Sequence, residues 1–359
     1  MLSNILDLSQ KLIHLKTDPD NISQLNKALE LVKTHLSEFT IEEFEHNSYK
    51  SILVYNSKNR PKKFKIILNG HLDIIPGKED QYNPIIKDGK LYGVGAMDMK
   101  SNLSSLLFAF KTMAGKVNYP LGLQIVTDEE IGGFNCTKFQ IKNGVDAEFV
   151  IASEPTNLNI VNQAKGIVQL EITFLGQTAH GAYPWKGVNA LELANKFINQ
   201  IKNIYPNPEQ EQWFTTTNIA KIETNNNSLN KIPDNCILKI DFRCIPQDLE
   251  QIIPNVKSII PFNSKLEILE KENALYTPSD NKFIQQIQKS TLDIAQFENK
   301  LYSANGTSDS RHYTDIGSFG VEFGPIGGGI GEDIEWVDIN SLKTYYHIIC
   351  DFLKKSENL

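Results

Sequence analysis

Short apolar runs alternate with longer amphipathic stretches over the first part of the chain. Residues 51–55, 64–68, 121–126 and 148–152 are rich in apolar and β-branched side chains, and each run has the length of a strand. The run 64–68 is nearly all apolar at its end, which is typical of a strand buried on both faces. Residues 1–37, with a break at Pro19, and residues 100–114 have helical periodicity. This alternation predicts an α/β fold with a mainly parallel sheet flanked by helices.

The pattern changes after about residue 162. Residues 166–176 and 235–243 show the in/out alternation of half-buried strands, with a helical stretch at 187–204 between them. A further helix-like and strand-like pair fills residues 247–271, which completes a small α+β sandwich with an antiparallel sheet. The first pattern returns with helical stretches at 280–293 and 340–355. The sequence therefore predicts a discontinuous domain, residues 1–162 and 274–359, and a second domain inserted at residues 163–273.

Length, charge and cysteine content restrict the classes of function. A chain of 359 residues is long for one domain, which agrees with two. The net charge of −7 and the lack of a long basic run argue against binding to nucleic acid or to an anionic membrane. Four scattered cysteines without a C-x-x-C pair argue against a disulfide framework. No apolar run approaches the roughly 20 residues of a membrane span, and signal-peptide features are missing, so we expect a cytoplasmic protein.

A histidine and a carboxylate follow the second predicted strand, and another carboxylate precedes a helix. In an extended chain, residues i and i+2 point to the same side. His71 can therefore bind a metal ion while Asp73 hydrogen-bonds its other ring nitrogen. Asp98 stands near the start of the predicted helix 100–114, where a carboxylate is favoured and can bridge two ions.

Three more acids follow buried strands. Glu129 and Glu130 come after the run 121–126, and Glu154 comes after the run 148–152. Two adjacent acids repel each other unless one binds a cation and the other serves as a base. Since the carboxyl ends of parallel strands meet at one crevice, the sequence predicts a divalent-metal site with a general base beside it.

Six segments together resemble motifs of the dinuclear-zinc amidohydrolase and aminoacylase family. That family includes acetylornithine deacetylase, succinyl-diaminopimelate desuccinylase and the glutamate carboxypeptidases. The resemblance covers nearly the whole chain and implies a zinc-exopeptidase-like catalytic domain with an inserted dimerisation or lid domain. The segments are 70–73 (Gly-His-Leu-Asp), 95–100 (Gly-Ala-Met-Asp-Met-Lys), 127–133 (Thr-Asp-Glu-Glu-Ile-Gly-Gly), 153–156 (Ser-Glu-Pro-Thr), 176–184 (Gly-Gln-Thr-Ala-His-Gly-Ala-Tyr-Pro) and 306–311 (Gly-Thr-Ser-Asp-Ser-Arg).

The resemblance implies a metal-binding role for four of these residues. Asp98 would bridge two zinc ions. His71 and Glu154 would complete one of the two sites, and Glu130 would hold the other. The cofactor would be Zn²⁺, one or two ions per chain, with Mn²⁺ or Co²⁺ as alternatives.

The resemblance also implies roles in proton transfer and orientation. Glu129 would be the general base that takes a proton from water and delivers it to the leaving amine. Asp73 would orient His71.

One ligand that the family usually has is missing. The family places a histidine after a glycine-rich loop, four or five residues before a glutamate. Counting back from Glu335, this position falls on Gly331 or Ile330, and neither side chain can bind a metal ion. Glu332 or Asp333 could take its place with a carboxylate oxygen, which would shift the preference towards manganese. Otherwise the chain holds one ion, or it is catalytically inactive.

The remaining histidines near the C-terminus are weak candidates. His347 lies inside the last helical stretch, where a packed or surface position is expected, and His312 is nearer the presumed cleft. The glycine-rich loop precedes acids and Trp336 instead of a helix with a lysine, which disfavours a phosphate-binding loop.

Four residues are candidates for contacts with the substrate. The guanidinium of Arg311 can grip a carboxylate with two parallel hydrogen bonds, and the resemblance implies this role for a small-molecule substrate with a free carboxylate. The resemblance also implies that His180 reaches the active site of the neighbouring subunit and stabilises the oxyanion. Asn230 and Arg243 match an Asn-x-Ile-Pro…Arg pattern and are further candidates. A role of His180 across an interface requires a homodimer, formed through the inserted domain.

The leading hypothesis is a metal-dependent hydrolase that cleaves the amide bond of an N-acyl amino acid. Within the same family, a di- or tripeptidase or a carboxypeptidase is the alternative. A binding or regulatory protein without activity is the alternative of another class, because the histidine is absent. A phosphoester hydrolase is disfavoured by the lack of a basic cluster near the acids.

Overall fold

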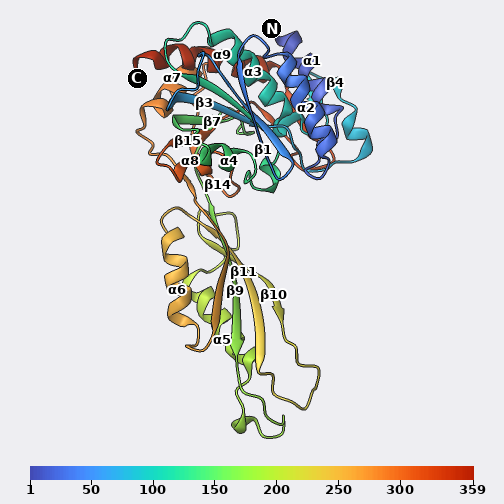
Figure 1. Cartoon of the computed structure of the whole chain (residues 1–359), viewed down its shortest axis with the longest axis vertical. Helices are drawn as coiled ribbons and strands as arrows, with labels where there is room; N and C mark the ends of the chain where they lie inside the picture. Colours follow the sequence, from blue (N-terminus) through green and yellow to red (C-terminus); the bar gives the residue numbers. More distant parts are fainter. The chain divides into compact units, whose positions relative to one another are not determined.

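The computed structural model describes residues 1–359, and the chain divides into two compact units. The first unit consists of Met1–Gln163, Leu275–Ser303 and Ser308–Leu359. The second consists of Ala164–Ala274 with the short segment Ala304–Thr307. The chain thus leaves the first unit, builds the second, and returns. Figure 1 labels several of the helices and strands of each unit.

A nine-stranded sheet forms the centre of the first unit. Its order is β1-β2-β6-β3-β7-β15-β8-β13, and β14 pairs with β8. Parallel pairing joins β6, β3, β7 and β15, whereas β1 with β2, β2 with β6, and β8 with β15 pair antiparallel. The predicted α/β class with a mainly parallel sheet is therefore confirmed. The strands are β1 Thr40–His46, β2 Tyr49–Tyr55, β3 Phe64–His71, β6 Leu121–Val126, β7 Ala147–Ala152, β8 Ile160–Ala164, β13 Leu275–Tyr276, β14 Leu301–Ala304 and β15 Phe319–Glu322.

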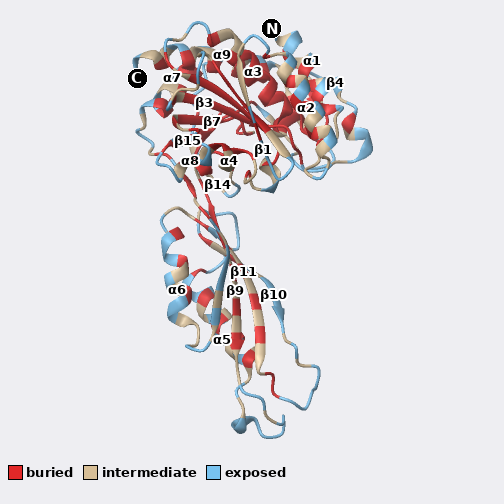
Figure 2. Cartoon of the chain, viewed as in Figure 1, coloured by how far each residue is buried: buried red, intermediate tan, exposed pale blue.

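Helices flank this sheet, and its central strands are buried almost throughout (Figure 2). The apolar faces of the helices pack against the sheet in one continuous core. For example, Phe149 of β7 stacks on Phe283 of α7, with 4.7 Å between ring centroids. This core fixes the strand ends that carry the candidate ligands. The helices are α1 Leu2–Ile13, α2 Ile22–Thr34, α3 Ser101–Met113, α4 Thr137–Lys142, α7 Lys282–Ala295, α8 Arg311–Thr314 and α9 Ile339–Lys355, with the short helices η1 Glu79–Tyr82, η2 Ala96–Lys100, η3 Glu129–Ile131 and η6 Ser356–Asn358.

A small four-stranded sheet of the first unit holds the glycine-rich loop. Its order is β16-β17-β5-β4, and the resolved pairs are antiparallel. The pairing of β17 with β5 brings the segment around Glu335 next to the chain that enters η2, where Asp98 lies. The strands are β4 Ile85–Lys87, β5 Lys90–Tyr92, β16 Gly327–Gly328 and β17 Trp336–Asp338.

The second unit is an antiparallel sheet with two helices. Its strand order is β10-β11-β9-β12, and alternate side chains of β9 and β11 are buried, as the in/out pattern predicts (Figure 2). The buried side chains pack against α5 and α6 in a separate core. The elements are β9 Gly166–Leu175, η4 Pro184–Lys186, α5 Ala190–Ile204, β10 Thr216–Glu223, β11 Asn235–Cys244, η5 Leu249–Gln251, α6 Ile252–Ile259 and β12 Lys265–Glu272.

The sequence patterns miss the two edge strands β1 and β10. Most side chains of both strands are exposed or only half-buried. An edge strand pairs on one side only and faces water over much of its surface, so it needs no apolar run. Without such a run, the apolar pattern gives no signal for these strands.

Candidate metal centre

The imidazole of His71 is buried at the end of β3. Its Nδ1 lies 2.9 Å from the main-chain oxygen of Asp73. A carbonyl oxygen can only accept, so Nδ1 donates the proton and Nε2 keeps its lone pair. The sequence predicts the Asp73 carboxylate as this partner, but its nearer oxygen is 3.5 Å away. The difference arises because the chain leaves the strand after His71 and turns the Asp73 carbonyl towards the ring.

Two carboxylates face Nε2 of His71. Asp98 Oδ1 lies 3.2 Å from this nitrogen, and Glu154 Oε2 lies 3.9 Å from it. One ligand atom from each of the three residues lies within 4.8 Å of the others. Three electron-pair donors at this separation repel one another unless a cation lies between them. The second Glu154 oxygen, Oε1, is buried without a hydrogen-bond partner, so the set fits a divalent metal ion.

The electrostatics of this group also favour positive charge. Burial opposes protonation of His71, yet Asp73 and Asp98 raise its pKa well above the usual value. Burial and the charge of Asp98 raise the pKa of Glu154 well above its usual value. The pocket therefore stabilises a cation next to Nε2, and a divalent ion supplies more positive charge than a proton.

A buried carboxylate, Glu335, holds the main chain that carries Asp98. Its Oε2 accepts the N–H of Gly95 at 2.9 Å, and its Oε1 accepts those of Met97 at 2.7 Å and Asp98 at 2.9 Å. Gly95 has φ of +73°, and a Cβ there would meet Ile74 at 2.7 Å, so the turn into η2 requires glycine. Burial raises the pKa of Glu335 to about 7, although these N–H groups oppose the shift.

Glu335→Gln is expected to weaken metal binding by about 10- to 100-fold, which is typical when a residue that orients a ligand is changed. The amide keeps the volume of the side chain, but its NH₂ group would face the Gly95 N–H and lose that hydrogen bond. Competition with a metal-binding dye gives the dissociation constant. Glu332→Gln is the matched control, because Glu332 is exposed in the same segment. Equal affinity of both variants would show that Glu335 does not position Asp98.

The adjacent acids Glu129 and Glu130 form the turn η3 directly after β6. The Asp73 carboxylate accepts the main-chain N–H of Glu130 at 2.8 Å, which ties this turn to the end of β3. Burial raises the pKa of Glu130 to about 7, and this side chain lies outside the group of three ligands. Burial also raises the pKa of Glu129 well above its usual value, against the attraction of His71. A carboxyl group with a raised pKa suits a residue that takes up a proton and then gives it away.

Glu332 and Asp333 lie outside the group of three potential ligands. Both residues are exposed, and Asp333 pairs with Lys78. The side chain of Gln81 donates to the main-chain oxygen of Glu332 at 2.9 Å, which holds this segment against η1. The first two acids after the glycine-rich loop thus face solvent, and Glu335 is buried.

Arg311 and His312 are buried at the start of α8. The two terminal nitrogens of Arg311 donate to the main-chain oxygens of Ser308 at 3.0 Å and Gly132 at 2.7 Å. His312 Nε2 lies 2.9 Å from the same Gly132 oxygen, so it does not face the ligand group. Both side chains thus hold the loop that follows Glu130. These bonds use two of the five N–H donors of the guanidinium, and Nε has no hydrogen-bond partner, so donors remain for the carboxylate of a substrate.

The sequence interpretation assigns no role to two buried acids, Glu322 and Glu335. Glu322 ends β15, and burial raises its pKa to about 7, with the charge of Asp98 adding to the shift. Its Oε1 has no hydrogen-bond partner. The available signal for Glu322 is that it ends a short β-rich run, much as Glu129 and Glu154 follow theirs. Glu335 precedes its strand and has no such signal.

His180, Asn230 and Arg243 belong to the second unit. Gly181 N–H donates to the main-chain oxygen of Asn230 at 2.7 Å, so His180 and Asn230 lie on adjacent segments. Arg243 lies near the opposite end of β11, roughly 26 Å along the strand from Asn235. It is exposed and donates to Asp241 at 3.0 Å. The three residues therefore do not form one cluster within this unit.

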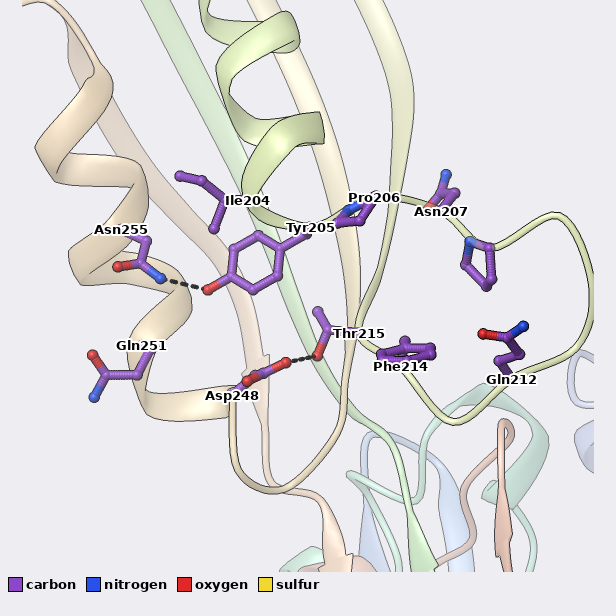
Figure 3. Close-up of a pocket in the computed structure, with 11 residues that line it drawn as sticks. Ile204, Tyr205, Pro206, Asn207, Gln212, Phe214, Thr215, Asp248, Gln251 and Asn255 are labelled. Atoms are coloured by element: carbon purple, nitrogen blue, oxygen red, sulfur yellow. Dashed lines mark hydrogen bonds between the residues drawn. The ribbon is translucent and has the colours of Figure 1, made fainter.

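A pocket of the second unit lies between the end of α5, the segment after it and α6 (Figure 3). Asn255 donates to the Tyr205 hydroxyl at 2.6 Å, and Thr215 donates to the Asp248 carboxylate at 2.6 Å. The other polar groups that line the pocket are mainly amides. With a single carboxylate and no histidine, this pocket offers no metal site.

Comparison with known proteins agrees with the geometry of the first unit. The sequence model of peptidase family M20/M25/M40 matches residues 67–355, which is most of the chain. The chain belongs to this family. A succinyl-diaminopimelate desuccinylase from Pelagibacter ubique is 29% identical over 312 residues, which are 79% of this chain and 81% of that M20 protein. An acetylornithine deacetylase from Proteus mirabilis is 30% identical over 256 residues, 65% of this chain and 66% of the relative.

Solved structures of the M20 fold also resemble the chain. The aminopeptidase PepT from Bacillus cereus has a TM-score of 0.78 at 16% identity and covers 99% of this chain and 98% of its own. The predicted family and the class of metal-dependent hydrolase are thus confirmed, since M20 proteins are metallopeptidases and related amidohydrolases. None of the helices combines the length and apolarity that a bilayer crossing requires.

Proposed function

We propose that this M20 hydrolase removes the acyl group from an N-acyl amino acid by cleaving its amide bond. The observation that carries the proposal is the convergence of His71, Asp98 and Glu154 next to Glu129. The curated relatives are named as a desuccinylase and a deacetylase, which supports deacylation over peptide cleavage. We propose Zn²⁺ as the ion, with Mn²⁺ and Co²⁺ as alternatives.

Each residue of the site has a separate role in amide hydrolysis. When bound, a divalent ion supplies Lewis acidity, which polarises the amide carbonyl and makes water a stronger acid. The carbonyl of Asp73 holds Nδ1–H of His71, so Nε2 remains available as a ligand. Glu129 takes a proton from the attacking water and passes it to the leaving amine nitrogen. The turn that carries Glu129 is held in place by the Asp73 carboxylate.

The second unit is proposed to form a homodimer and to place His180 at the site of the partner chain. In support, Nδ1 of His180 accepts the N–H of Ala182 at 3.1 Å, so the proton of the neutral ring is on Nε2. His180 is exposed, so Nε2–H is available as a donor. A donor of this kind can stabilise the oxyanion that forms when water attacks the carbonyl.

The test is a substrate panel on the purified chain after separate loading with zinc and manganese. N-acetyl and N-succinyl amino acids, dipeptides and tripeptides are compared by kcat/KM, from the release of free amino groups. We expect the highest kcat/KM on an N-acyl amino acid with a free carboxylate, and loss of turnover after chelation. A preference for peptides would favour the peptidase alternative. Bound metal without turnover on any substrate would favour a binding protein.

A further inference from the structure

The first unit supplies three ligands for one ion but only two for a second. His71, Asp98 and Glu154 form the one group of three potential ligands in the structure. A second ion beside them would share Asp98 and bind Glu130, whose main-chain N–H is tied to the Asp73 carboxylate at 2.8 Å, next to His71. Catalytic metal sites in proteins commonly use three protein ligands, so this second position lacks one.

Three side chains that could supply the missing ligand are engaged elsewhere. The Glu335 carboxylate accepts three main-chain N–H groups. Asp333 is exposed and pairs with Lys78. His312 directs Nε2 to a main-chain oxygen. A second ion could use one of these three only by breaking its contact, and no further acid or histidine forms a group of three ligands with Asp98 and Glu130.

Gly331 has no side chain, so the space beside it is free. A larger residue there could supply the third ligand of the second ion. A Cβ at this residue would lie 3.7 Å from Cδ1 of Ile75, and no other atom comes within 4 Å. The main-chain N–H of Ile75 binds the carboxylate of Glu130. The open space beside Gly331 therefore borders the segment that holds Glu130. Gly331 has φ of +68°, a conformation in which histidine is among the better tolerated residues.

We propose that each chain holds a single metal ion, on His71, Asp98 and Glu154, and that the glycine at position 331 is the reason why Glu130 holds no second one. This inference rests on the metal-dependent hydrolase proposed above and specifies its metal centre. It is tested by counting ions, which does not depend on knowing the substrate.

Metal content per chain is measured by elemental analysis after dialysis from separate zinc and manganese loads. We expect one ion in the unaltered chain and two in Gly331→His. Gly331→Phe is the matched control, because it places a ring without a ligand atom on the same backbone, and it should retain one ion. Gly331→His combined with Glu130→Gln should also return to one ion, since the second site needs both residues.

Two ions in the unaltered chain would overturn the proposal. A count of one in a Gly331→His variant whose circular dichroism and thermal unfolding match those of Gly331→Phe would overturn it too. If Gly331→His does not fold, the metal content of Glu130→Gln in the otherwise unaltered chain tests the proposal instead. An unchanged count supports the single site, and a lower count contradicts it. A folded chain without any ion would refute the proposed function as well, whereas one ion without turnover would refute the proposed function alone.

Discussion

Glu129→Gln is expected to lower kcat by about 10²- to 10⁴-fold while the metal content stays the same. The amide has nearly the same shape as the carboxyl group, but it cannot take a proton from water. Glu129 lies outside the three-ligand group, so the ion does not depend on it. The measurement is kcat and KM on the best substrate of the panel, together with metal per chain. A loss confined to kcat would assign Glu129 to the chemical step.

Two further variants show whether the loss belongs to proton transfer. Glu129→Asp keeps a carboxylate at a shorter reach and should retain more activity than Glu129→Gln. Glu298→Gln changes an exposed glutamate of the same unit and should leave kcat unchanged. Near-normal turnover of Glu129→Gln would remove this residue as the base, and loss of metal would show that it is a ligand instead.

His180→Ala is expected to reduce kcat by about 10²- to 10³-fold, the usual effect of removing one donor to an oxyanion. Metal content should not change, because His180 belongs to the second unit and the ligands to the first. His347→Ala is the control, since His347 is exposed on α9. Full activity of His180→Ala would disprove the proposed role.

Mixed dimers separate a role of His180 in its own chain from a role in the partner. Co-expression of Glu129→Gln with His180→Ala gives some dimers in which one site combines an intact Glu129 with an intact His180 from the other chain. Random pairing should then restore about a quarter of the unaltered activity, from the one intact site in each mixed dimer. If His180 acts within its own chain, or if the chain is a monomer, mixing restores nothing.

The buried strands could be predicted from the sequence because burial on both faces leaves an apolar run. The prediction for β6 has the same bounds as the strand, Leu121–Val126. The prediction for β3 ends at residue 68, whereas the strand continues to His71. Asn69 and Gly70 are not typical strand residues, but β6 and β7 pair with β3 on either side there and hold it extended. Pairing with neighbours thus overrides local preference.

The ligand group could be predicted because His71 and Glu154 lie at strand ends and Asp98 lies near the start of a helix. The contacts that orient them could not. Nδ1 of His71 binds a main-chain carbonyl, which has no signature in the sequence. Glu335 reaches a main-chain segment 240 residues earlier at Gly95, and no local pattern encodes such a contact. For the same reason, the exposure of Glu332 and Asp333 could not be distinguished from the burial of Glu335.

The contact between Glu335 and the Asp98 segment also sets an order of events during protein synthesis. His71 and Glu154 leave the ribosome long before Glu335, whose three hydrogen bonds fix the main chain around Asp98. A nascent chain therefore cannot fix the main chain around Asp98 until Glu335 has also left the ribosome.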